Sequence, residues 1–161
     1  MLLEFEARHM LSVLEQAAIP GLLLKGQAIA QWAYPDPSLR TSGDIDVLVA
    51  TLDAANTLAR HLCEAGYELS QPSGDRFVQE MMLRREVTPS VWVEIDFYWG
   101  VINSYLFSKR FTFDELMAES IALPRLGANA RGLAGACLHP CLHALGGDTG
   151  CRRRDPAEVV V

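Results

Sequence analysis

The sequence has no apolar stretch long enough to span a bilayer and no excess of basic residues. Lysine and arginine together number 14 against 20 aspartates and glutamates, which gives a formal net charge of -6. An acidic balance opposes the broad attraction to phosphate on which non-specific nucleic-acid binders depend. The composition therefore excludes a membrane-spanning protein and favours a small molecule or a protein as the partner.

A secretion signal and a disulfide framework are missing as well. Glu4, Glu6 and Arg8 stand in the region that a signal peptide keeps apolar. Only four cysteines occur in 161 residues, and inside a cell such residues are expected to be free thiols. We therefore expect a soluble, cytoplasmic protein.

Internal repeats and low-complexity tracts are also lacking, so the chain is expected to form one domain. Half of its residues are hydrophobic, which is enough to bury a core without disulfides or metals. Periodic patterns end near residue 146, and glycine and arginine dominate beyond it. The sequence predicts an α/β domain over residues 1–146, with a mixed sheet flanked by helices, and an irregular tail over residues 147–161.

The hydrophobic spacing predicts the following elements. Apolar residues three and four apart indicate helices over residues 3–18, 26–34, 52–65, 113–121 and 133–145. Short apolar or alternating runs indicate strands over residues 22–24, 45–50, 77–87 and 91–99. A Thr-Pro-Ser turn separates the last two strands, which predicts a hairpin.

Two aspartates open the strand that follows the loop PDPSLRTSG. Side chains at positions i and i+2 of a strand point to the same face, so Asp44 and Asp46 project together. Like charges this close are unfavourable without a cation, and Mg²⁺ takes carboxylate oxygens as ligands. An isolated Asp-x-Asp pair is nevertheless common on protein surfaces, so further residues must support a metal site.

A second acidic strand provides that support. In VWVEIDFYW, alternation directs Glu94, Asp96 and Tyr98 to one face, and it directs to the core face Val91, Val93, Ile95 and Phe97. If the two acidic strands are neighbours, Asp96 or Glu94 completes a cluster of three carboxylates that is able to hold two metal ions for phosphoryl transfer. Alternation alone does not decide between these two residues.

A glycine at a helix start points to a phosphate site. Gly26 follows a strand and opens a helix, where backbone N–H groups and the helix dipole favour a triphosphate. Lys25 and Arg40 are expected to add positive charge there.

A zinc site near the end of the chain is the weaker alternative. His139 and His143 are four residues apart, with Cys137, Cys141 and Cys151 nearby. This spacing fits no standard zinc finger, and we expect these side chains to be buried or partly buried instead.

The run LLLKGQAIAQWAYPDPSLRTSGDIDVLVA resembles the signature of the bacterial uncharacterised nucleotidyltransferase family, within the DNA polymerase β superfamily. Members typically show Leu-Lys-Gly, a Tyr-Pro-Asp-Pro-type loop, an arginine and then Asp-Ile-Asp. The segment VEIDFYW is similar to the family's later acidic strand, usually Asp-Leu-His-Trp, although Tyr98 stands where the family often has histidine. The resemblance covers roughly residues 20–145 and implies a polymerase β-like nucleotidyltransferase fold.

The resemblance also implies a site and a reaction. It assigns metal binding to Asp44 and Asp46, selects Asp96 over Glu94 as the third carboxylate, and marks Gly26 as the phosphate-binding turn. The expected activity is transfer of a nucleoside monophosphate from an NTP to an acceptor hydroxyl, with Mg²⁺ or Mn²⁺ as cofactor. The alternative is a catalytically silent module of the same fold that binds a nucleotide or a partner protein.

Overall fold

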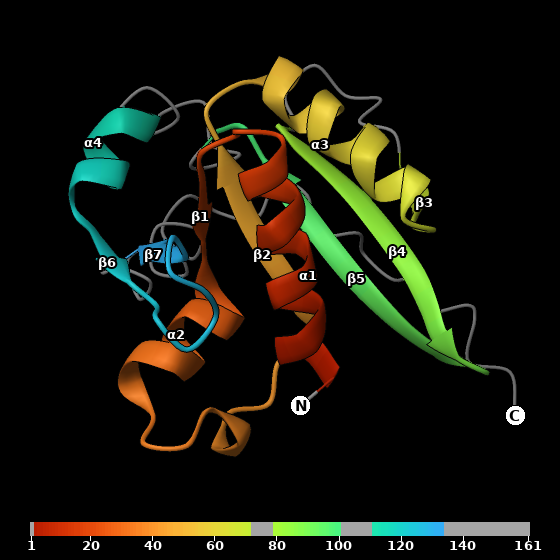
Figure 1. Ribbon diagram of the computed structural model, residues 1–161, viewed down its shortest axis with the longest axis horizontal. Helices are drawn as coiled ribbons and strands as arrows, with labels where there is room; N and C mark the ends of the chain where they lie inside the picture. The colour runs from red at the N-terminus through yellow and green to blue at the C-terminus, as the bar shows by residue number, and fades with distance from the viewer. Residues whose placement is uncertain (1, 72–78, 101–110, 134–161) are drawn as a thin grey trace, which may run out of the picture.

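The computed structural model describes residues 2–71, 79–100 and 111–133 (Figure 1). The helices of this part are α1 (Leu2–Gln16), α2 (Lys25–Ala33), α3 (Leu52–Glu64) and α4 (Phe113–Ala118), with a 3-10 turn η1 (Pro37–Leu39). The strands are β1 (Gly21–Leu23), β2 (Asp44–Val49), β3 (Glu68–Gln71), β4 (Glu80–Thr88), β5 (Val91–Tyr98), β6 (Ser120–Ala122) and β7 (Arg131–Leu133).

All of these strands belong to one mixed sheet. Its order is β3-β4-β5-β2-β1-β7-β6 over seven strands. β2 runs parallel to β5 and antiparallel to β1, and β4 runs antiparallel to β5. The predicted mixed sheet flanked by helices is confirmed, and so is the predicted hairpin, which is β4 and β5.

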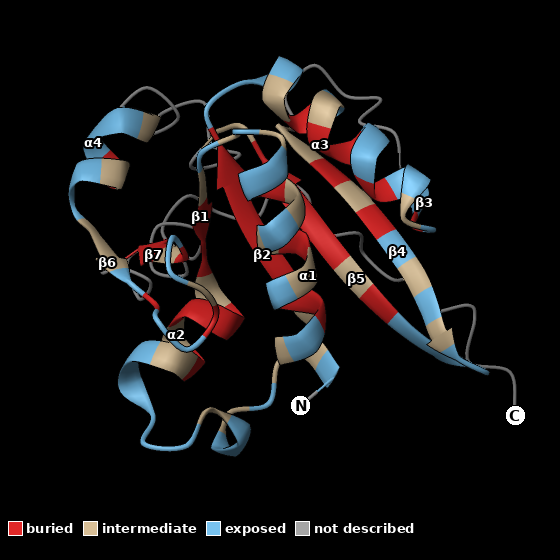
Figure 2. Cartoon of the chain, viewed as in Figure 1, coloured by how far each residue is buried: buried red, intermediate tan, exposed pale blue. Residues whose placement is uncertain are grey.

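Helices α1 and α3 cover one face of the sheet (Figure 2). Their buried residues recur at the three- and four-residue spacing of an amphipathic helix, as in Ala7, Met10 and Leu14 of α1 and Ala55, Leu58 and Leu62 of α3. They pack in the main core with Val47 of β2. Leu48 points to the opposite face, where it packs with Leu116 of α4. The strand is therefore covered on both sides, and Asp44 and Asp46 share the face of Leu48.

A polar network lies under α1. Glu6 is 1% exposed, and its carboxylate accepts hydrogen bonds from Arg85 Nη2 at 2.6 and 2.5 Å. The Tyr67 hydroxyl donates a further hydrogen bond to Glu6, and the Arg85 guanidinium lies 4.6 Å from the Tyr67 ring centre. Because a buried carboxylate is costly unless it is paired, this network fixes α1 against β4.

The predicted helix over residues 113–121 is wrong at its last residues. Helix α4 ends at Ala118, and Ser120 and Ile121 belong to β6. The Ser120 hydroxyl donates a 2.6 Å hydrogen bond to the Met117 carbonyl, while Ile121 pairs with Gly132 of β7. Pairing with a distant strand thus overrides the helical spacing, which carries no information about that strand.

The expectation that Val91 faces the core is also wrong. Val93, Ile95 and Phe97 are buried as predicted, but Val91 is 43% exposed. Figure 2 shows the reason: the tip of the β4/β5 hairpin extends beyond the covering helices.

Residues 134–161 lie outside the described part of the chain. They include the predicted tail, nearly all of the predicted helix over residues 133–145, and the five zinc candidates Cys137, His139, Cys141, His143 and Cys151. Leu133 itself ends β7. None of the helices in the described residues combines the length and apolar character that a bilayer crossing requires.

Candidate metal and nucleotide site

The two acidic strands are direct neighbours. β2 and β5 pair in parallel with Asp44 opposite Glu94 and Asp46 opposite Asp96. Residues opposite each other in a sheet point to the same face, so all four carboxylates lie on the face turned away from α1 and α3. Asp46 is 1% exposed and Asp96 is 8% exposed.

The structure brings Asp44, Asp46 and Asp96 together. One carboxylate oxygen from each residue lies within 4.8 Å of the other two, and Glu94 is not part of this group. Asp96 pairs with the buried Asp46, whereas Glu94 pairs with Asp44 at the first residue of β2. The convergence expected from the strand phases is therefore found, with Asp96 as the third member.

The donor atoms of this triad suit a hard divalent cation. Asp46 Oδ2 and Asp96 Oδ1 are buried and have no hydrogen-bond partner. A buried carboxylate oxygen without a partner is unfavourable, and Mg²⁺ and Mn²⁺ are bound by oxygen ligands of this type. The residues present thus fit a divalent metal ion.

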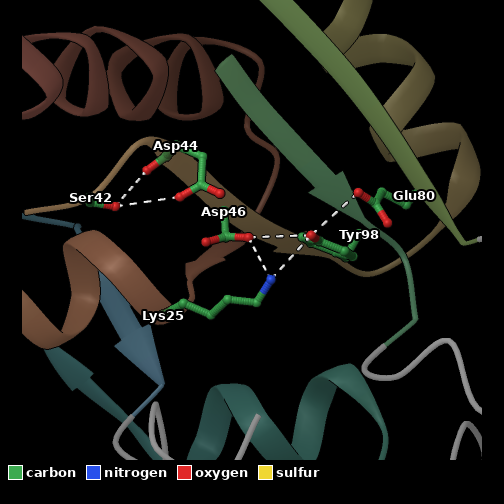
Figure 3. Close-up of polar contacts among 6 residues, drawn as sticks. All are labelled: Lys25, Ser42, Asp44, Asp46, Glu80 and Tyr98. Carbon is green, nitrogen blue, oxygen red and sulfur yellow. Dashed lines mark hydrogen bonds and ion pairs between the residues drawn. The ribbon is translucent and has the colours of Figure 1, made fainter. Parts of the chain in front are cut away.

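Lys25 reaches into the same cluster (Figure 3). Its ammonium donates a 2.9 Å hydrogen bond to Asp46 Oδ1 and lies 3.3 Å from the Tyr98 hydroxyl. The Tyr98 hydroxyl in turn lies 3.3 Å from Asp46 Oδ1 and 3.4 Å from Glu80 Oε1. The lysine predicted to contact a phosphate is therefore ion-paired with a carboxylate of the triad.

Gly26 contacts the loop that leads into β2. A Cβ atom added to Gly26 would lie 2.1 Å from Ser42 Oγ, so the serine occupies the space that the missing side chain leaves. The same Ser42 hydroxyl lies 3.0 Å from the Asp44 carbonyl oxygen and 3.4 Å from Asp44 Oδ1. Glycine here permits the close approach of Ser42, which orients Asp44.

Arg40 follows η1 on the same loop. Its Nη1 donates a 3.1 Å hydrogen bond to the Thr41 carbonyl, and its side chain lines an open pocket of about 400 Å³, together with Gln31, Ser42 and Gly43. The predicted phosphate contact of Arg40 stays a prediction.

Two residues beside the triad, Glu80 and Ser42, were not predicted from the sequence. Glu80 pairs with Tyr98 across the hairpin, which places its carboxylate beside the triad. Counting from the turn does not find this pair, because the hairpin register shifts between Glu86 and Thr88, and without the shift Met81 would oppose Tyr98. Ser42 had a signal in the sequence, namely a small polar residue two positions before Asp44.

Burial and nearby negative charges raise the pKa values of two carboxylates in the cluster. Burial, reinforced by the negative charges of Glu80, Asp46 and Asp44, raises the pKa of Asp96 to about 7. Burial also raises the pKa of Asp46, and the Lys25 ammonium partly offsets this effect. The crowded carboxylates therefore favour a proton or a cation between them.

An acidic triad on adjacent strands could hold a divalent metal ion. The chain belongs to the uncharacterised nucleotidyltransferase family, whose profile matches residues 1–154. The resemblance drawn from the sequence motifs is thereby confirmed. A search of curated proteins found no match.

Proposed function

We propose that this chain transfers a nucleoside monophosphate from an NTP to a hydroxyl group of an acceptor and releases pyrophosphate. The observation that carries the proposal is the convergence of Asp44, Asp46 and Asp96 on one face of adjacent strands. The family membership supports the same reaction class. The net charge of -6 favours a small molecule or a protein over bulk nucleic acid as the acceptor.

The residues divide the chemistry among them. Asp44 and Asp46 would hold Mg²⁺ or Mn²⁺, and Asp96 would complete the set on the acceptor side. A bound divalent ion supplies Lewis-acid polarisation of the phosphate oxygens. Lys25, the backbone at Gly26 and Arg40 contribute positive charge and N–H donors for the triphosphate.

The proposed reaction forms one bond, breaks one bond and transfers one proton to the protein. The acceptor oxygen forms a bond to the α-phosphorus while the bond from that phosphorus to the pyrophosphate oxygen breaks. The acceptor's hydroxyl proton passes to the Asp96 carboxylate on the acceptor side of the set. Catalysis then depends on positioning and charge and forms no covalent enzyme intermediate.

The test is a labelling experiment. The purified chain is incubated with each α-³²P-labelled NTP, Mg²⁺ or Mn²⁺ and a cell extract, and the labelled product is identified. Label is expected to appear in an acceptor with wild-type protein and not with Asp46→Asn. Metal-dependent NTP binding without transfer to any acceptor would overturn the proposal in favour of the silent nucleotide-binding module.

A further inference from the structure

The side chain of Lys25 lies inside the acidic cluster. Its Nζ contacts Asp46 Oδ1 at 2.9 Å, and it lies 5.0 Å from the Tyr98 ring centre. Its side chain is 29% exposed, whereas that of Asp46 is 1% exposed. Among the described residues, Lys25 is thus the cation in direct contact with the triad.

The backbone holds Lys25 in this place. The Leu24 N–H donates a 2.9 Å hydrogen bond to the Asp46 carbonyl, which ties the start of α2 to β2. Lys25 itself has a φ of 39°, a left-handed conformation that a residue with a side chain adopts only when its surroundings require it. Its Cα is therefore fixed beside Asp46, and its ammonium reaches the carboxylate oxygens.

This geometry has a consequence for cation binding. Three carboxylates with oxygens within 4.8 Å repel one another, and the Lys25 charge relieves part of that repulsion. The same charge repels a divalent ion that approaches the cluster. An anionic triphosphate, in contrast, attracts the ammonium away from Asp46, and the Tyr98 hydroxyl, at 3.3 Å, remains to donate a hydrogen bond to Asp46 Oδ1.

We propose that Lys25 is an internal counter-ion of the triad. Its charge weakens the binding of free divalent metal, and its ammonium moves away from Asp46 when a nucleoside triphosphate binds. The inference rests on the proposed function, because it assumes a metal-nucleotide complex as the natural ligand. Lys25 then serves as a positioning residue that makes metal binding depend on nucleotide.

The test compares Mn²⁺ binding by wild type, Lys25→Met and Lys25→Arg, with and without a non-hydrolysable α,β-methylene ATP. Free Mn²⁺ is measured by electron paramagnetic resonance at pH 8. Without nucleotide, Lys25→Met is expected to bind Mn²⁺ about tenfold more tightly than wild type, because a nearby positive charge is gone. Lys25→Arg keeps the charge and is expected to resemble wild type. The nucleotide should strengthen Mn²⁺ binding by a larger factor in wild type than in Lys25→Met.

Two further variants serve as controls. Lys25→Gly removes the charge and also accepts the positive φ, so it keeps the test valid if Lys25→Met folds poorly. Arg84→Met removes a cation from the same sheet at a position where it stacks on Trp92, and it is expected to leave Mn²⁺ binding within about twofold of wild type.

The outcomes separate the two proposals. If Lys25→Met and Lys25→Gly both bind Mn²⁺ as weakly as wild type or more weakly, the counter-ion proposal is wrong, even if the wild-type protein transfers label to an acceptor. Tighter binding by both variants, with no labelled product from any NTP, would support the counter-ion and overturn the transferase. Absence of Mn²⁺ binding by every protein under both conditions would overturn both.

Discussion

At the scale of single residues, Asp46 is central to the proposed metal site. Asp46→Asn keeps the shape and still accepts a hydrogen bond from Lys25, but it removes the charge that a metal ion requires. The variant is expected to lose detectable Mn²⁺ and NTP binding at concentrations that saturate wild type. In chelator, its melting temperature should equal or exceed that of wild type, because repulsion within the cluster falls.

The control for this variant is Asp53→Asn in the first turn of α3, which lies outside the cluster and should bind metal as wild type does. A large fall in the melting temperature of Asp46→Asn alone would show that the Asp46 carboxylate stabilises the folded protein.

The distinction between Asp96 and Glu94 belongs to the same scale. Asp96→Ala is expected to reduce turnover by about 100-fold or more while NTP binding is largely kept, because in the proposed reaction Asp96 serves the acceptor side of the site. Glu94→Ala removes an acid outside the converged group and should retain measurable activity. If Glu94→Ala is inactive and Asp96→Ala is active in the labelling assay, Glu94 is the third carboxylate of the site.

The raised pKa of Asp96 predicts a pH dependence of stability. In the folded protein this pKa is about 7, against an ordinary value of 3.8. Between these values the folded state binds a proton that the unfolded state releases, so the free energy of unfolding falls as pH rises from 3.8 to 7. Asp96→Asn should show a flatter fall over this window in chelator, measured by urea unfolding. Parallel pH profiles for the two proteins would contradict the prediction.

At the scale of elements, Gly26 and Ser42 join α2 to β2. Gly26→Ala places a Cβ atom 2.1 Å from Ser42 Oγ, and relief of this overlap must displace the Ser42 hydroxyl that contacts Asp44. The expected loss is about 1–3 kcal/mol of unfolding free energy, accompanied by weaker Mn²⁺ binding.

A double-mutant cycle isolates this contact. With Ser42→Gly added, the nearest remaining neighbour of the new Cβ is the Asp44 carbonyl oxygen at 3.7 Å, an ordinary van der Waals distance. The double variant should therefore lose less stability than the two single losses combined. Additive losses would show that the two residues act independently.

At the scale of the whole molecule, the buried Glu6 carboxylate fixes α1 against the β4/β5 hairpin that carries Asp96. Glu6→Ala leaves the Arg85 charge without its partner, and Arg85 is 23% exposed. We expect a loss of about 3–5 kcal/mol in urea unfolding. The matched control is Glu4→Ala, which breaks the exposed ion pair with Arg8 and should cost less than about 1 kcal/mol. Similar losses for both variants would contradict the structural role of Glu6.

The sequence by itself determined the local features of the molecule. Hydrophobic periodicity located α1, α3, the β4/β5 hairpin and β2, because a side chain's face on a helix or strand follows from its own position in the repeat. The same periodicity put Asp44 and Asp46 on one face, and likewise Glu94 and Asp96. The motif around these residues indicated the nucleotidyltransferase family.

The tertiary structure alone decided how those features meet. Parallel pairing of β2 with β5 in one register brought Asp96 to Asp46, the irregularity near Glu86 brought Glu80 to Tyr98, and the tie between α2 and β2 turned Lys25 onto Asp46. It also ended α4 early in favour of β6. The physical reason is common to all four: each is a contact between segments that are separated in the sequence, which no local pattern encodes. Where strands pair, a one-residue change of register also reverses the direction of every side chain.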